Sequence, residues 1–231
     1  MDISKIKLLI DTVKYLKPLQ VYYRLYYFVR NRIFIKEFVQ KPVPLFESIF
    51  WKNKLNCPTS YSKRNKSFNF LNVTHQFSGR IDWNCNNYGK LWTYNLNYFD
   101  FLNQEGMSKE IGIDLIIDYI KNDKTLKDGK EPYPISLRGI NWVKFLSKNK
   151  IKNTKINKAL YHDYRRLLKN LEYHLLGNHL LENAFSLLFG AYYFQDEKLY
   201  AKSKKLLISE LDIQILNDGA HYELSPMYHQ I

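Results

Sequence analysis

Cysteine is scarce in this sequence, which has only Cys57 and Cys85 in 231 residues. Two cysteines cannot form the multiple-disulfide framework of small secreted domains, and they do not make a metal-binding cysteine motif. No apolar run approaches the ~18 residues of a membrane-spanning helix. The N-terminus also lacks the uninterrupted apolar centre of a signal peptide, because Asp11 and Lys14 interrupt it. We therefore expect free thiols and, by default, a cytoplasmic chain.

Blocks of like charge are also missing, although the chain is strongly basic. It has 35 Lys and Arg against 22 Asp and Glu, a net charge of +13. Such a surplus favours acidic partners, namely nucleic acid, anionic lipid or an acidic polysaccharide, and it also serves solubility alone. The charges are spread along the chain, and no zinc-finger or RNP-type motif occurs, so we expect no nucleic-acid partner. Aromatic residues make up 16% of the chain, 19 of them Tyr, and suit either sugar stacking or ordinary packing.

Residues 3–35 have the pattern of a basic amphipathic helix. Tyr22, Leu25, Tyr26 and Val29 share one face of it. Such a helix can lie on a membrane surface, but it more often packs its apolar face on its own domain. We expect packing and no membrane contact, and we keep the membrane surface as a third functional interpretation.

The rest of the chain divides into an irregular part and a helical part. Residues 41–90 contain several Pro and Gly and short aromatic stretches such as SFNFLNV, which predict a connecting region with two or three short strands. From residue 93 the helical period dominates, and it ends at Asp218-Gly219. Its clearest matches are Ile113, Ile116, Ile117 and Ile120; Tyr164, Leu168, Leu171 and Leu175; the apolar stretch 180–194; and the stretch 199–216. The pattern predicts a mainly α chain of helical hairpins, which could be a bundle, a solenoid or an α/α toroid.

A break in this helical pattern falls within LLGNHLLENAFSLLFG, residues 175–190. Gly177 can end the preceding helix in a left-handed conformation, and Asn178 is then a favoured N-cap of the next helix, followed by His179. The same geometry suits anion binding, since a helix N-terminus has unpaired N–H groups and the positive end of the dipole. An Asn and a His at that point could hold a carboxylate and make the adjacent C–H bond more acidic.

A second polar cluster, DGAHYELSPMYHQ, occupies residues 218–230. It contains His221, Tyr222, Glu223, Tyr228 and His229. A Tyr hydroxyl transfers protons only when its neighbours tune its pKa, and the alternative is an exposed polar turn. The His spacing matches no metal motif, and no HExxH sequence occurs, so we expect no metal ligands.

Two further stretches contain groups that suit a sugar acid. EPYPISLRGINWVKF, residues 131–145, contains Arg138 for bidentate carboxylate binding and Tyr133 and Trp142 for stacking. LWTYNLNYFDFL, residues 91–102, adds Trp92. The alternative for both is a turn or helix whose aromatic side chains belong to the core.

In this order, the four stretches resemble the heparinase II/III-like polysaccharide lyases, which include alginate-lyase-like proteins. The resemblance covers roughly residues 91–231, and its specific elements are the Asn-His pair at a helix start and the later SxxYH stretch. It implies an α/α toroid followed by a large antiparallel β-sandwich. Because residues 93–231 contain no sandwich-like run of strands, we expect an incomplete toroid over 91–231, truncated at its C-terminal end, after an N-terminal helix and irregular region over 1–90.

The resemblance also implies a function, β-elimination on a uronic-acid polysaccharide of the heparan sulfate or alginate type. Asn178 and His179 would neutralise the uronate carboxylate, and Tyr228 would transfer a proton to the glycosidic oxygen. The candidates for substrate contact are Arg138, Trp92, Trp142, Tyr133, Glu223 and His229. No cofactor is implied. The expected partners are an acidic polysaccharide and the missing β-sandwich, and family habit would make the location periplasmic.

Two expectations separate this hypothesis from its alternative. Asn178, His179 and Tyr228 should face one cleft, since all three roles concern a single sugar ring. The chain alone should be inactive, because the family takes a further catalytic His or Tyr from beyond the last residue. The alternative is a non-catalytic helical module, or remnant, that binds glycan beside polysaccharide synthesis.

Overall fold

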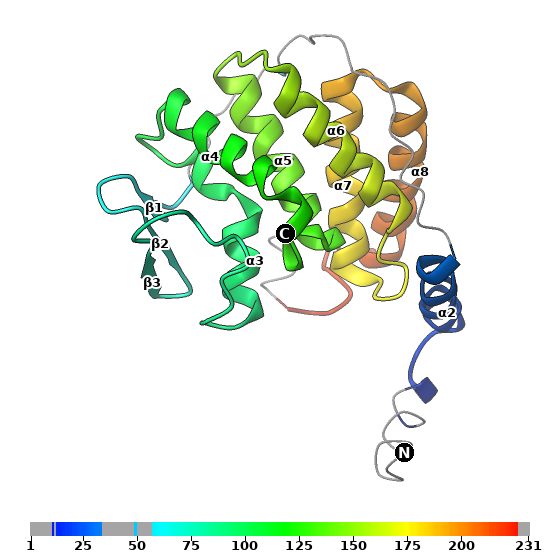
Figure 1. The fold of residues 1–231 in the computed structure, drawn as a ribbon. Coiled ribbons are helices and arrows are strands. Elements are labelled where there is room, and N and C mark those ends of the chain that lie inside the picture. Colours follow the sequence, from blue (N-terminus) through cyan, green and yellow to red (C-terminus); the bar gives the residue numbers. More distant parts are fainter. Residues whose placement is uncertain (1–10, 12, 34–48, 50–56, 226–231) are drawn as a thin grey trace.

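A computed structural model describes residues 11, 13–33, 49 and 57–225. Figure 1 shows an N-terminal helix at one side, a small sheet at the other and a group of helices between them. The elements in chain order are α2 (Pro18–Ile33), β1 (Tyr61–Ser62), β2 (Ser67–Phe70), β3 (Val73–Gln76), α3 (Lys90–Tyr98), η1 (Asp100–Asn103), α4 (Lys109–Lys121), η2 (Asp123–Thr125), η3 (Asp128–Lys130), α5 (Pro132–Lys148), α6 (Thr154–Lys169), α7 (Gly177–Phe194) and α8 (Glu197–Gln214). The predicted mainly α class is confirmed, whereas closure into a toroid and the division at residues 90/91 stay predictions.

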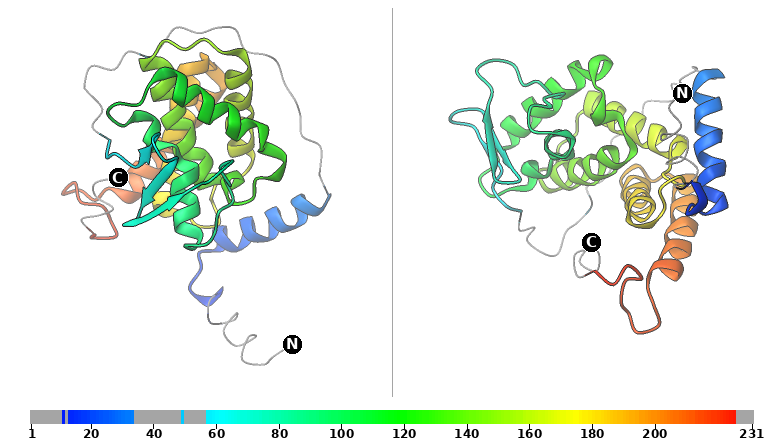
Figure 2. Two further views of the ribbon diagram at one scale, coloured as in Figure 1. Left: turned by 60° about the vertical axis from the view of Figure 1, so that its left-hand side comes forward. Right: turned by 90° about the horizontal axis from the view of Figure 1, so that it is seen from below.

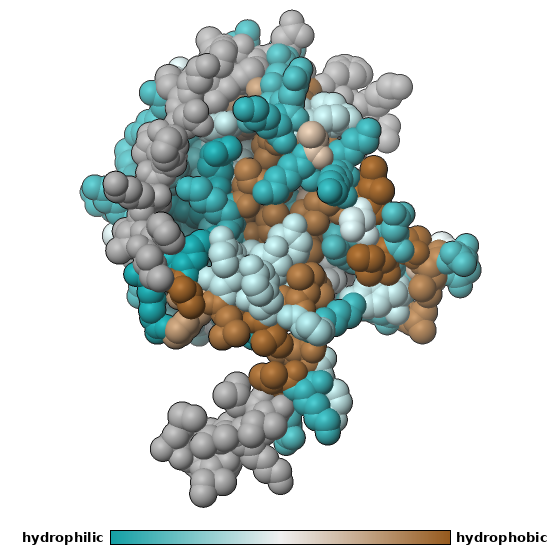
Figure 3. Space-filling view, turned by 90° about the vertical axis from the view of Figure 1, so that its right-hand side faces the viewer, coloured by the Kyte–Doolittle hydropathy of each residue, from teal (hydrophilic) through white to brown (hydrophobic). Residues whose placement is uncertain are grey.

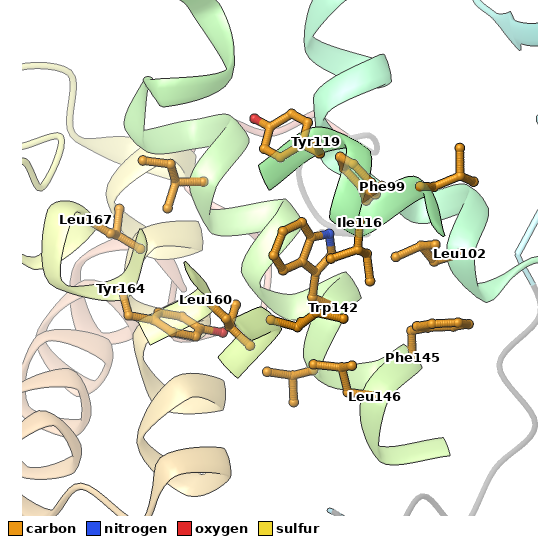
Figure 4. Close-up of a cluster of buried hydrophobic side chains, with 14 of the residues drawn as sticks. Phe99, Leu102, Ile116, Tyr119, Trp142, Phe145, Leu146, Leu160, Tyr164 and Leu167 are labelled. Atoms are coloured by element: carbon orange, nitrogen blue, oxygen red, sulfur yellow. The ribbon is translucent and has the colours of Figure 1, made fainter. Parts of the chain in front are cut away.

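Helix α5 is the centre of the packing. It contacts α3, α6 and α7, and α7 in turn packs along α8. Helices α5 and α7 approach α6 closely because each has a glycine opposite Tyr164: a Cβ atom would come within 2.9 Å of that side chain at Gly139 and within 2.8 Å at Gly190. Trp142, one turn after Gly139 on α5, packs edge-on against Phe99 and Tyr119, with ring centroids 5.4 and 6.0 Å away (Figure 4).

The predicted short strands form one antiparallel sheet in the order β1-β2-β3. Phe68 pairs with Tyr61 on one side and His75 on the other. Alternation along β2 buries Phe68 and Phe70 and exposes Asn69, which is the pattern of a strand with one face on the core. The sheet lies at the far end of the molecule from α2 (Figure 2).

The helical pattern over residues 164–175 is wrong beyond Lys169, where α6 ends. The Asn170 side chain donates to the Arg166 carbonyl, 2.7 Å away, and residues 170–176 then form a turn before α7. Leu171 is still buried, so the apolar spacing is satisfied by a turn that folds back onto the core rather than by a longer helix.

Of the helix predicted over 3–35, the part Pro18–Ile33 is confirmed as α2, whereas residues 15–17 are not helical. The prediction that its apolar face packs on the domain is wrong. Tyr22, Leu25, Tyr26 and Val29 are 44–62% exposed. The opposite, more polar face contacts the turn after α6, where Tyr27 donates to the Leu171 carbonyl over 2.6 Å and Gln20 to that of Leu175 over 3.0 Å. No described helix is long and apolar enough to span a membrane.

Candidate functional site

Helix α7 begins at Gly177, where the chain has just passed through two residues of positive φ, Leu176 at 65° and Gly177 at 57°. Leu176 is the N-cap, and no side chain caps the helix. The expectation that Asn178 is the N-cap is therefore wrong, because the helix begins one residue earlier and Asn178 lies within its first turn. The first-turn position predicted for His179 is correct.

His179 lies at the edge of the molecule between a carboxylate and an aromatic ring. Its Nδ1 is 3.2 Å from Oε1 of Glu172, and its ring centroid is 4.6 Å from that of Tyr133. The His179 side chain is 35% exposed, whereas that of Glu172 is only 6% exposed. A buried carboxylate thus holds a partly exposed imidazole from behind.

Glu172 is itself fixed by Asn183, one turn further along α7. The Glu172 N–H donates to Asn183 Oδ1, and Asn183 Nδ2 donates to Glu172 Oε2, both over 2.9 Å. Asn183 Nδ2 also lies 3.0 Å from the Ser136 hydroxyl oxygen of α5. Because an ionised carboxylate only accepts hydrogen bonds, Glu172 fixes the His179 proton on Nδ1 and directs Nε2 away from itself.

A row of tyrosines continues from His179 toward α3. Tyr133 lies 6.0 Å from Tyr98, and Tyr98 lies 6.1 Å from Tyr94, measured between ring centroids. The Tyr94 hydroxyl donates to Glu131, whose other oxygen is 2.7 Å from Lys90 Nζ. Burial raises the pKa of Tyr94 and Tyr98, and nearby carboxylates raise it further. Both phenols therefore stay protonated at neutral pH, so they act as hydrogen-bond donors rather than bases.

The segment after α8 returns to the start of α7. Gln214 Nε2 donates to the Gly177 carbonyl over 2.9 Å, and His221 Nε2 lies 3.1 Å from Gln214 Oε1. A Cβ atom on Gly177 would meet the Tyr222 hydroxyl at 3.0 Å and a Glu223 carboxylate oxygen at 3.2 Å. The structure thus brings the predicted residue Glu223 next to Gly177, the residue before Asn178. Tyr228 and His229 lie outside the described residues, so their place in a shared cleft stays a prediction.

Three predicted substrate contacts are instead core residues. Arg138, Trp92 and Trp142 are at most 1% exposed. The Arg138 Nη2 atom binds Asp163 Oδ2 over 2.7 Å, and its Nη1 binds the Gly129 carbonyl over 2.9 Å. Trp92 Nε1 donates to the Val73 carbonyl. Because these three side chains are buried, the prediction that they contact a sugar directly is wrong. The alternative, that they belong to the core, describes all three.

Several residues of the site were not selected from the sequence. Glu172 lies in a stretch with a helical pattern, and no motif joins it to His179 or Asn183. Glu131 opens the stretch EPYPISLRGINWVKF but has no local mark of its pairing with Lys90. Among the described residues, no group of three or more His, Cys, Asp or Glu is placed to hold a metal ion.

Comparison with known proteins adds one match. A family model described as the heparinase II/III N-terminus matches residues 136–231, which run from α5 to the end of the chain and include Glu172, Asn178 and His179. No curated protein and no solved structure matches the chain. The match covers less than half of the sequence, but it includes both Asn178-His179 and the segment that returns to Gly177. Residues 136–231 therefore form a heparinase II/III N-terminal-like region.

Proposed function

We propose that this chain is the helical part of a polysaccharide-lyase-like protein and that its site at the start of α7 receives a uronic acid. The observation that carries the proposal is the buried Glu172 holding the partly exposed His179 beside Asn178, within the region that matches the heparinase II/III N-terminus. The match to a lyase family supports β-elimination as the class of reaction. The groups at the start of α7 support an acidic sugar as the ligand.

Carboxylate recognition follows from the groups at the start of α7. The helix has 18 residues, and its first N–H groups have no intrahelical partners, so its dipole favours an anion there. The Asn178 amide can donate to one carboxylate oxygen, and the protonated His179 ring can donate from Nε2 to the other. The buried Glu172 faces the same ring through Nδ1, 3.2 Å from its Oε1. Tyr133 lies against the same ring, tilted by 50°, and is the aromatic side chain that we propose contacts the sugar.

The reaction we propose is β-elimination. A base removes the proton from the carbon next to the carboxylate, the bond between C4 and the glycosidic oxygen breaks, and a C4=C5 double bond forms while the leaving oxygen gains a proton. Asn178 and His179 would stabilise the negative charge that develops on the carboxylate. Tyr228 is our proposed donor to the leaving oxygen.

Two carboxylates around the site, those of Glu131 and Glu172, have basic partners, which limits their repulsion of an acidic sugar. Glu131 is balanced by Lys90, with 2.7 Å between their charged atoms, and this pairing raises the pKa of Lys90. Glu172 is balanced by His179 only while that ring is protonated. We therefore expect affinity for a uronate to depend on the charge of His179.

The test combines binding with turnover on the full chain. Uronate oligosaccharides from alginate and heparan sulfate are titrated by calorimetry, and unsaturated uronate is followed by its ultraviolet absorbance. Asn178→Ala and His179→Ala should each weaken binding, and each should lower any elimination rate by ~10²–10³. Asn69→Ala is the matched control because Asn69 is exposed on β2, in the sheet and not at the start of α7.

The outcomes separate the two functions that the sequence left open. Binding that depends on Asn178 and His179 supports a uronate site, and rising absorbance with it would support the lyase and contradict the expectation that the chain alone is inactive. Site-dependent binding with no absorbance change agrees with that expectation and favours a non-catalytic glycan-binding module as the function of this chain. Absence of binding to every uronate polymer, with the protein folded by circular dichroism, would overturn both.

A further inference from the structure

Helix α2 is attached to the protein by its polar face. Gln20 and Tyr27 donate to backbone carbonyls of the turn after α6, and Arg30 Nη1 donates to the Lys169 carbonyl. Tyr23 stacks on Tyr173, with ring centroids 4.5 Å apart. The Lys169 carbonyl lies in the last turn of α6, where carbonyls have no intrahelical partner, and the other two belong to the turn that follows. These contacts account for the docked face of the helix.

The opposite face of α2 has the apolar residues and no described cover. Six large hydrophobic residues on it are 44–62% exposed: Leu19, Tyr22, Leu25, Tyr26, Phe28 and Val29. Figure 3, which faces the side of the molecule on which α2 lies, shows hydrophobic surface beside strongly hydrophilic residues there. An amphipathic helix normally buries its apolar face, and a contiguous exposed patch marks a contact with something outside the domain.

The charges of α2 identify the chemistry of that contact. Residues 18–33 contain Arg24, Arg30 and Arg32 and no acidic residue, and Lys14 and Lys17 come just before them. Arg24 is exposed, and the Arg32 guanidinium lies 3.4 Å from the Phe28 ring centroid, so two cations flank the apolar face. Exposed tyrosines and arginines around Leu and Val are typical of helices that lie in the plane of a bilayer surface.

We propose that the outward face of α2 binds the surface of an anionic lipid membrane. The 16 residues make a helix of roughly 24 Å, which can lie flat with Leu25 and Val29 in the acyl boundary and the arginines at the phosphates. A second copy of α2 fits less well, because it would bring arginines against arginines with no acidic residue to pair them. An acidic glycan would satisfy the arginines but offers no apolar layer for Leu25 and Val29.

Vesicle sedimentation of the full chain tests this proposal. Vesicles of phosphatidylcholine alone are compared with vesicles that contain phosphatidylglycerol. We expect co-sedimentation with the anionic vesicles, weakened by salt. Each arginine near the surface contributes about fivefold in affinity, so Arg24→Gln/Arg32→Gln should weaken binding roughly 25-fold. Leu25→Asn/Val29→Asn should weaken it at least tenfold, because it removes the inserted apolar surface.

Matched variants on α8 provide the controls. Ile208→Asn/Ile213→Asn removes two exposed apolar residues, and Lys202→Gln/Lys205→Gln removes two exposed charges, without touching α2. Both controls should sediment like the unchanged protein. The proposal is overturned if anionic vesicles bind nothing or if the α8 variants lose binding equally. It is also overturned if Leu25→Asn/Val29→Asn converts a dimer to a monomer in ultracentrifugation, or if this variant alters only binding to heparin.

Discussion

Two pairs of a cation and a carboxylate lie on opposite sides of α5, and they differ in their access to solvent. The sealed pair, Arg138 with Asp163, has side chains that are 1% and 11% exposed. The open pair, His179 with Glu172, has the carboxylate buried and the cation 35% exposed. Both pairs join residues far enough apart in the sequence that only the fold brings them together.

The difference lies in what each cation has left to donate. Arg138 also binds the carbonyls of Gly129 and Asn97, so its guanidinium is used up within the core. The Gly129 carbonyl belongs to η3 and the Asn97 carbonyl to α3. Arg138 therefore links these two elements to its own helix α5 and, through Asp163, to α6. Among the described residues, His179 makes its hydrogen bond through Nδ1 and none through Nε2. The comparison teaches that the charge of a residue type says little about function until its free donors and its exposure are known.

The largest effect should come from breaking the sealed pair. Arg138→Met keeps much of the side-chain volume but leaves Asp163 buried without its main cation. We expect the free energy of unfolding to fall by ~3–5 kcal/mol, because an unpaired buried charge is strongly destabilising. Urea denaturation of the full chain measures it.

Lys90→Met is the control for this prediction, since it removes a cation from a half-exposed pair with Glu131. Its cost should stay below ~1 kcal/mol. Equal costs for the two variants would mean that burial does not separate the pairs and that Arg138 is no structural tie.

A smaller effect is expected when the open pair loses its charge but keeps its shape. Glu172→Gln can still accept from Asn183, but its amide would donate toward His179 Nδ1. The ring proton of neutral His179 should therefore move from Nδ1 to Nε2. The ¹⁵N chemical shifts of the imidazole report this tautomer directly, and the ring of His162 on α6 serves as the internal control. An unchanged His179 tautomer would contradict the role that we assign to Glu172.

The sequence predicted the helices well where period and burial agree. The apolar stretch 180–194 is part of α7, and the stretch 199–216 corresponds to α8, which ends at Gln214. It failed at residues 170–176, because the turn is stabilised by Tyr27 and Gln20, more than 140 residues away in the chain. Local patterns have no access to such partners, and the same limit explains why the apolar face of α2 was placed inward.

The candidate site was predicted only in its local part. Asn178 and His179 follow each other, so their common position at a helix start can be read from adjacent letters. The position of Glu172 depends on the turn over residues 170–176, which the apolar period alone predicts as helix. Its side chain and backbone N–H are held by hydrogen bonds with Asn183. Arg138 was wrongly predicted to bind the carboxylate of a substrate. It does bind a carboxylate, but that carboxylate is Asp163 of the same chain.

The smallest expected effect is a pH dependence of the free energy of unfolding that comes from His174, two residues from Glu172. It tests how the turn that contains the open pair's carboxylate responds to protonation. Burial lowers the pKa of His174, with further lowering by Arg24 and His179 and a partial rise from Glu172. Its Nδ1 is buried and has no hydrogen-bond partner in the part of the chain that the structure describes, and its ring lies edge-on to Tyr27 at 5.7 Å. The folded protein thus binds this proton less readily than the unfolded chain does. The stabilising contribution is complete above the ordinary His pKa of about 6.5 and is lost as pH falls through and below it.

His174→Phe should abolish this loss, because it keeps an aromatic ring against Tyr27 and cannot be protonated. Unfolding is measured from pH 7.5 to 5 for both proteins, and their difference is compared at each pH. This difference removes the opposite trend of Glu182 and Glu210, whose pKa values burial raises and which therefore stabilise the fold as pH falls. The unchanged protein should lose stability relative to His174→Phe on acidification, since protonating His174 opposes the docking of α2 on the turn that contains Glu172. A pH-independent difference would show that His174 does not sense protons there and that the turn is held by the hydrogen bonds of Tyr27 and Gln20 alone.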